Sequence, residues 1–166
     1  FDDCNLDKTL DMVVPQKFRN AGQVCVSPTR FYVQSGIYDA FVKGFAERTQ
    51  KVKVGNGLEA DTKMGPLAND RRPEAVGALI SDAEAKGARV LAGGSKGDGG
   101  FFFQPTLLAD VPNEAKIMNE EPFGPVAVTR AFSTFDEVIE QANRLPFGLA
   151  AFAFTENGRR ANLIGD

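Results

Sequence analysis

Apolar residues recur at helical spacing in three long segments of the chain, and short β-branched or aromatic runs separate these segments. Helices are expected at residues 7–19, 37–52 and 74–86. Strands are expected at residues 29–34, 89–91, 126–132 and 150–155. Helices and strands alternate, and the connections are long enough for right-handed crossovers. The predicted fold class is therefore α/β, with a mostly parallel sheet flanked by helices.

Local signals predict where the elements begin and end. Pro15 removes one amide inside the first helix, and Asn20-Ala21-Gly22 interrupts it. Two further helices are expected at 134–143 and 158–164. The glycine-rich run 93–100 lacks the residue order of a phosphate-binding loop, so it is expected to be a surface loop.

Length and charge indicate a single domain and exclude some kinds of binding partner. The 166 residues fit one domain, so 1–166 is treated as a single unit. Lys and Arg number 19 against 22 Asp and Glu, a net charge of −3, and no segment is basic enough to bind a nucleic-acid backbone. The chain has no apolar run long enough for a membrane span. We therefore expect neither nucleic acid nor membrane as a partner.

The chain contains no histidine, which excludes Ser-His-Asp and Cys-His catalysis and zinc sites that need imidazole. Its two cysteines, Cys4 and Cys25, are too few for a four-cysteine metal site or a disulfide framework. No metal site is expected. The low cysteine content is typical of a reducing compartment, so the predicted location is cytoplasmic.

Two positions could carry chemistry. Cys25 follows the small residues Ala21 and Gly22, which allow backbone amides to approach a reacting atom beside a thiol. Glu121 lies in a stiff segment with prolines at 122 and 125, which suits holding a ligand hydroxyl. On these residues alone, a buried inert thiol and a solvated acidic pair are the simpler interpretations.

Two motifs favour a functional role for Cys25 and Glu121 over these simpler interpretations. Phe-Arg-Asn-Ala-Gly-Gln-Val-Cys at 18–25 resembles the active-site cysteine motif of the NAD(P)-dependent aldehyde dehydrogenases. Glu-Glu-Pro-Phe-Gly-Pro-Val at 120–126 resembles the glutamate-x-phenylalanine-glycine-proline motif of that family. Other short matches follow in the same order, among them Met-Gly-Pro-Leu at 64–67 and Pro-Phe-Gly-Leu-Ala at 146–150. The resemblance covers essentially the whole chain.

The resemblance implies a role for each matching residue. Cys25 would be the nucleophile, and its own N–H one oxyanion donor. Glu121 would hold the nicotinamide ribose hydroxyls of NAD or NADP, and Phe123 would pack near the nicotinamide. Ser27 and Phe147 would line the tunnel for a small-molecule aldehyde. The family mechanism forms a thiohemiacetal and then a thioester, and it uses no histidine.

The family pattern also extends beyond this chain. The general-base glutamate, the oxyanion asparagine and the cofactor-binding domain would precede Phe1, and an oligomerisation strand would follow Asp166. The expectation is therefore a catalytic domain at 1–166 that is inactive by itself, from a parent enzyme that forms a homo-oligomer. Cys4, where the family has a small residue, is expected in the core.

Within the family, the motifs are most similar to the branch that oxidises semialdehydes such as succinate semialdehyde. Two alternatives remain open from the sequence. One is a non-catalytic structural or assembly domain of the same descent, in which Cys25 is inert. The other is an acyl-CoA-forming aldehyde dehydrogenase, in which coenzyme A replaces water in the last step.

Overall fold

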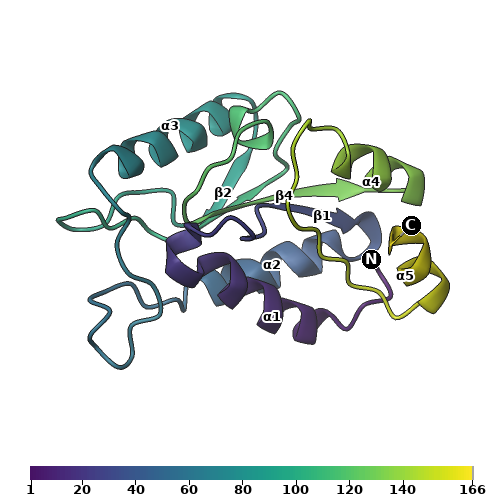
Figure 1. Ribbon diagram of the computed structural model, residues 1–166, viewed down its shortest axis with the longest axis horizontal. Helices are drawn as coiled ribbons and strands as arrows, with labels where there is room; N and C mark the ends of the chain where they lie inside the picture. Colours follow the sequence, from purple (N-terminus) through teal and green to yellow (C-terminus); the bar gives the residue numbers. More distant parts are fainter. Residues whose placement is uncertain (166) are drawn as a thin grey trace.

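The computed structural model describes residues 1–165 and contains one four-stranded sheet with helices on both faces (Figure 1). The strands are β1 (Arg30–Gln34), β2 (Arg89–Ala92), β3 (Thr106–Ala109) and β4 (Val126–Phe132). The α-helices are α1 (Leu6–Phe18), α2 (Tyr38–Thr49), α3 (Arg71–Ala85), α4 (Phe135–Ala142) and α5 (Gly158–Gly165). Three short 3₁₀ helices are η1 (Arg19–Gly22), η2 (Ser35–Ile37) and η3 (Lys116–Met118). Figure 1 shows α1 and α2 on one side of the sheet and α3 on the other.

The strand order β1-β4-β3-β2 confirms the predicted α/β class with a mostly parallel sheet. β4 is parallel to β1 and to β3, and only the edge strand β2 is antiparallel. In the register of β1 and β4, Arg30 lies opposite Val128. Because these strands are parallel neighbours, the loops that precede them meet at the same edge of the sheet.

Helix α1 forms despite Pro15. The side chain of Asn5 caps its first turn by accepting a hydrogen bond from the N–H of Lys8 at 3.0 Å. The stripe predicted from the spacing of apolar residues is buried, with Leu10, Val13, Val14 and Phe18 in the core. Phe18 packs edge-on against Phe45 of α2, with ring centroids 6.3 Å apart. The free energy gained by burying this stripe outweighs the loss of the one helical hydrogen bond that the proline cannot donate.

One predicted strand is corrected by the structure. The run 150–155 is not a strand; it lies open with most of its residues exposed, because the described chain offers it no ladder partner. Pro105 directly precedes β3, which begins at Thr106. The other predicted helices and strands are present, with ends shifted by a few residues. None of the helices formed by residues 1–165 has the length and apolar character needed to cross a membrane.

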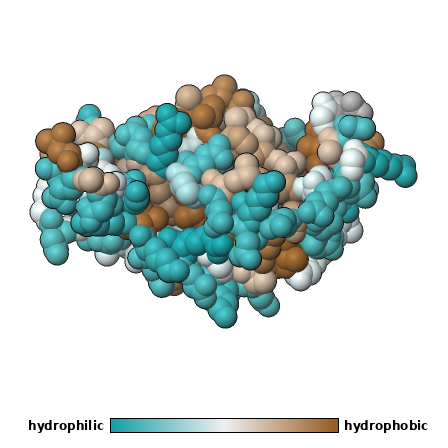
Figure 2. Space-filling model, turned by 90° about the horizontal axis from the view of Figure 1, so that it is seen from below, coloured by the Kyte–Doolittle hydropathy of each residue, from teal (hydrophilic) through white to brown (hydrophobic). Residues whose placement is uncertain are grey.

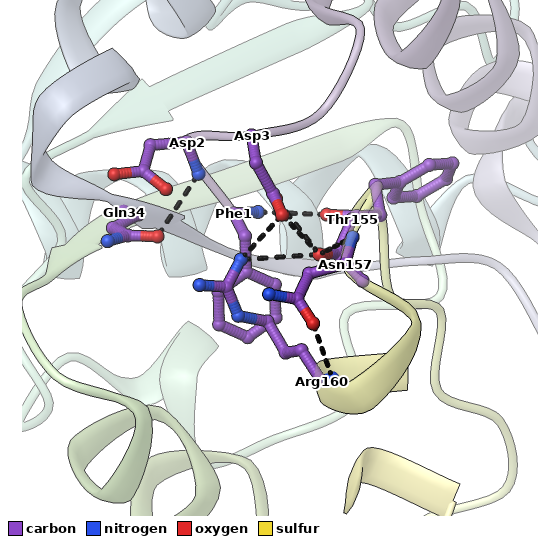
Figure 3. Close-up of polar contacts among 8 residues, drawn as sticks. Phe1, Asp2, Asp3, Gln34, Thr155, Asn157 and Arg160 are labelled. Atoms are coloured by element: carbon purple, nitrogen blue, oxygen red, sulfur yellow. Dashed lines mark hydrogen bonds and ion pairs between the residues drawn. The ribbon is translucent and has the colours of Figure 1, made fainter. Parts of the chain in front are cut away.

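The first and last segments of the chain are held together by a polar network (Figure 3). The hydroxyl of Thr155 lies 2.9 and 2.8 Å from the two carboxylate oxygens of Asp3 and donates to this group. Arg160 forms an ion pair with Asp3 at 2.9 Å, and its guanidinium lies 4.5 Å from the ring centroid of Phe1. The backbone nitrogen of Phe1 donates to the carbonyl of Phe154 at 3.0 Å. This network holds the run 150–155 and α5 against the start of the chain.

The charge state of Asp3 follows from these contacts. Burial raises the pKa of Asp3, but the hydrogen bond from Thr155 and the positive charge of Arg160 outweigh it, so the pKa lies below its ordinary value of 3.8. The ionised form is thus favoured by folding. Its contribution to stability is present above pH 3.8 and is lost as the pH falls through the lowered pKa.

Replacing Thr155 by valine should lower the free energy of unfolding at pH 7, because the charged Asp3 acceptor loses its donor. Urea unfolding measures this change, and the difference from the parent chain should shrink below pH 3.8. Thr62→Val is the matched control, since the buried hydroxyl of Thr62 has no hydrogen-bond partner among the described residues. An equal loss in both variants would contradict the role given to the network.

Candidate active site

Cys25 lies in the segment 20–29 that precedes β1, here called the cysteine loop, and its side chain is exposed. The loop begins with three consecutive left-handed residues, Asn20, Ala21 and Gly22, at φ 50°, 54° and 70°. A tight turn follows, in which the N–H of Ser27 donates to the carbonyl of Val24 at 2.9 Å. The N–H of Cys25 donates no hydrogen bond within residues 1–165. It is therefore available to an oxyanion beside the thiol.

Glu121 lies in the segment 119–125 that precedes β4, here called the glutamate loop. Its carboxylate forms no hydrogen bond or ion pair in the part of the chain that the structure describes. Phe123, two residues later, has a positive φ of 41° and a side chain that is 39 % exposed. Both side chains are therefore accessible to a ligand.

The two loops touch backbone to backbone. A Cβ atom on Gly22 would lie 2.1 Å from the carbonyl oxygen of Gly124, a distance that no side chain tolerates. On the opposite side, a Cβ on Gly124 would lie 2.6 Å from a methyl group of Val76 in α3. Glycine at position 22 thus lets the cysteine loop approach the glutamate loop, and glycine at position 124 lets the glutamate loop pack against α3.

All five residues predicted from the sequence line one open cavity of about 840 Å³: Cys25, Ser27, Glu121, Phe123 and Phe147. The floor comes from β1, and the run 148–154 and α5 form the opposite wall. Cys4, expected in the core, is only half-buried and lies at this cavity too. Within residues 1–165, no group of three or more His, Cys, Asp or Glu side chains is arranged to hold a metal ion.

Apolar side chains remain exposed around the cavity. Phe147, Leu149, Phe152 and Leu163 are 46–70 % exposed. Figure 2 shows apolar patches between hydrophilic areas on the face seen from below. Contiguous apolar surface is typical of interfaces, so association through this side of the chain stays a prediction.

Ser27 is held from behind by Lys17. The hydroxyl of Ser27 donates to the carbonyl of Lys17 at 3.3 Å, and the Lys17 ammonium lies 3.5 Å from the same hydroxyl. The Ser27 hydroxyl is therefore engaged inside the protein, although the residue lines the cavity. Its predicted contact with substrate stays a prediction.

Lys17 is fully buried and has no carboxylate partner among the described residues. Burial, together with the like charge of Arg30, lowers the pKa of Lys17 to about 7 from its ordinary 10.5. Lys17 is not among the site residues predicted from the sequence. The sequence does contain a sign of this buried lysine. Lys17 lies four residues after Val13, on the buried stripe of α1, where an apolar residue is expected.

Arg30 supports the glutamate loop through two of its three guanidinium nitrogens. Its Nε donates to the carbonyl of Met118 and an Nη to that of Glu120, both at 3.0 Å. The guanidinium also lies 5.9 Å from the ring centroid of Phe147. These bonds to carbonyls give Arg30 a structural role.

Comparison with known proteins agrees with this geometry. The family model described as "Aldehyde dehydrogenase family" matches residues 1–166. The chain therefore belongs to the aldehyde dehydrogenase family.

Among its relatives is TsaD2 of Comamonas testosteroni, named a putative 4-(hydroxymethyl)benzenesulfonate dehydrogenase, at 48% identity over 95% of this chain and 33% of that protein. The succinate-semialdehyde dehydrogenase [NADP(+)] GabD of Escherichia coli is 44% identical over 100% of this chain and 35% of its own length. Betaine aldehyde dehydrogenase from Staphylococcus aureus, solved in complex with NAD+, is 34% identical with a TM-score of 0.95, over 99% of this chain and 34% of that one. The chain spans about a third of the length of these relatives.

Lys17→Met should raise the free energy of unfolding at pH 7 by an amount on the order of 3 kcal/mol, because a buried charge is removed. Between about pH 7 and 10.5 the unfolded chain binds the lysine proton and the folded chain does not, so the parent chain gains stability as the pH rises. The variant loses this slope. Urea unfolding across this range tests it, with the exposed Lys8→Met as control; an unchanged slope in Lys17→Met would refute the assignment.

Gly22→Ala should destabilise the protein by about 2 kcal/mol or more, because the added methyl group meets the carbonyl of Gly124 at a left-handed φ. Hydrogen exchange should increase in both loops at once, at residues 20–27 and 119–125. Gly65→Ala is the control, since a Cβ there meets nothing within 4 Å. If only residues 20–27 loosened, the proposed coupling of the loops would be wrong.

Proposed function

We propose that the complete protein oxidises an aldehyde to a carboxylic acid, with Cys25 as nucleophile and NAD or NADP as hydride acceptor. The observation that carries this proposal is the meeting of Cys25 and Glu121 at one cavity. They come from loops that precede the neighbouring parallel strands β1 and β4. Family membership and the motifs at 18–25 and 120–126 support it.

The thiolate of Cys25 attacks the aldehyde carbon, and a carbon–sulfur bond forms while the carbonyl oxygen takes the negative charge. The N–H of Cys25, which donates no hydrogen bond within residues 1–165, donates to this oxyanion. Loss of hydride from the same carbon leaves a thioester on Cys25. Water then adds to the thioester, releases the acid and returns the thiol.

A nicotinamide dinucleotide suits the residues on the other side of the cavity. The Glu121 carboxylate has no internal partner in residues 1–165, so it can accept hydrogen bonds from ribose hydroxyls. Phe123 presents an exposed ring for packing against the nicotinamide end. When bound, the cofactor supplies the hydride acceptor. One relative was solved in complex with NAD+ and another is named for NADP(+), which supports either dinucleotide.

The substrate class that we propose is an aldehyde that carries an anionic group. Semialdehydes are the members of this class that we favour. GabD is named for succinate semialdehyde, and TsaD2 is named for a benzenesulfonate. Both names describe compounds with an anionic group. Two nitrogens of Arg30 bond to the carbonyls of Met118 and Glu120, so we do not assign recognition of the anion to Arg30.

Cys25→Ser in the full-length protein should lower NAD(P)H formation from succinate semialdehyde by about 10³-fold or more, because no thioester forms. The matched control is Cys4→Ser, at the second free thiol of the same cavity, which should keep its rate. Butanal, the uncharged analogue of the same length, tests the proposed charge preference. Undiminished turnover by Cys25→Ser would refute the nucleophile, and equal kcat/KM for both aldehydes would refute the substrate class.

A further inference from the structure

The glutamate loop has little backbone support of its own. Between Glu120 and Gly124, no backbone–backbone hydrogen bond involves Glu121, Pro122 or Phe123 in the described chain. A loop without such bonds samples many conformations, and fixing it costs conformational entropy. Pro122 and Pro125 restrict this loop and Gly124 is held against Gly22, so the order still needed around Glu121 has to come from other contacts of the chain.

Three arginines from separate elements supply that order. Arg30 at the start of β1 donates to the carbonyls of Met118 and Glu120, both at 3.0 Å. Arg144, after α4, also donates to the carbonyl of Met118, at 3.0 Å. Arg72 in α3 donates to the carbonyls of Pro122 and Phe123, which are the two residues after Glu121. Carbonyls on both sides of Glu121 are therefore held by guanidinium groups.

Arg144 also acts through Asn119. Its Nη1 donates to the Asn119 side-chain oxygen at 2.7 Å. The amide nitrogen of Asn119 in turn donates to the carbonyls of Asn113 and Ala115 at 2.7 and 2.9 Å. The start of the loop is thus tied to the segment that precedes η3.

The three cations are not paired with carboxylates. None of Arg30, Arg72 and Arg144 forms a salt bridge among residues 1–165, and the carboxylate of Glu121 forms none either. The Nε atoms of Arg72 and Arg144 are buried without a hydrogen-bond partner there. A buried unpaired donor costs stability, so an arrangement optimised for stability alone would not contain two. The guanidinium groups donate hydrogen bonds to neutral carbonyls, and the Glu121 carboxylate remains accessible to a ligand.

We propose that Arg30, Arg72 and Arg144 form a guanidinium clamp that holds the backbone around Glu121 and so presents its carboxylate to the ribose of the nicotinamide cofactor. This inference rests on the proposed function. The three arginines are positioning residues, since they act through the loop. A planar guanidinium suits the task at Arg30, because its Nε and one Nη reach two different carbonyls, which a single ammonium group does less well. Pre-organisation of this kind lowers the entropy lost when the cofactor binds.

The test uses the full-length protein with Arg30→Met, Arg72→Met and Arg144→Met as separate variants. Hydrogen exchange of the cofactor-free protein should increase at least several-fold at residues 119–124 and remain unchanged in α1. The KM for NAD(P)+ should rise about 10-fold, with the KM for aldehyde unchanged. Arg130→Met is the matched control, because Arg130 lies on β4 and donates to the carbonyl of Val111, outside the loop. The control should change neither quantity.

Glu121→Gln separates the clamp from the cofactor role. It should raise the KM for NAD(P)+ and leave exchange at 119–124 unchanged. If Glu121→Gln left the cofactor KM unchanged, the proposed role of Glu121 would fail, whatever the arginine variants do. If it raised the KM but all three arginine variants left exchange at 119–124 and the cofactor KM unchanged, the clamp would be refuted. Increased exchange throughout the sheet would also overturn it, since the arginines would then be supporting the whole fold.

Discussion

The site depends on one close approach, in which the backbone at Gly22 lies against the carbonyl of Gly124. No side chain fits between them, so the distance between the cysteine loop and the glutamate loop is set by van der Waals contact of main-chain atoms. The left-handed turn that ends α1 makes this contact possible, because it directs the chain from the helix toward the sheet edge. Displacement of either backbone would move the thiol relative to the residues proposed to hold the cofactor.

Parallel pairing of β1 and β4 brings these two loops together. In open α/β sheets, ligands commonly bind beyond the carboxyl ends of the strands. Here both loops precede their strands, so Cys25 and Glu121 lie at the amino ends, and the cavity extends from them along β1. The polar support lies behind the loops: Lys17 contacts Ser27, and Arg30 contacts the glutamate loop. Their side chains are thus used within the protein, whereas Cys25 and Glu121 remain accessible. The opposite wall, made by the run 148–154 and α5, is held by the network around Asp3 and Thr155.

Much of the architecture could be predicted from the chain because amphipathic spacing reflects burial directly. The stripe of α1 and the apolar run of β4 are buried as their patterns predict. The run 150–155 has an equally apolar pattern, yet it forms no strand, because a strand also needs a partner with free N–H and C=O groups. A pattern along one segment carries no information about whether such a partner exists. Pro15 shows the reverse case, in which tertiary burial maintains a helix against a local signal.

The sequence by itself determined the α/β class, the family resemblance and the two motifs with Cys25 and Glu121, because each is written in consecutive residues. Only the tertiary structure decided that these motifs share a cavity and that Lys17 is buried without a counter-charge. It also decided which carbonyls Arg72 and Arg144 bind. A carbonyl is present in every residue, so neither composition nor spacing can specify the acceptor of a distant guanidinium. That choice follows from how the elements pack.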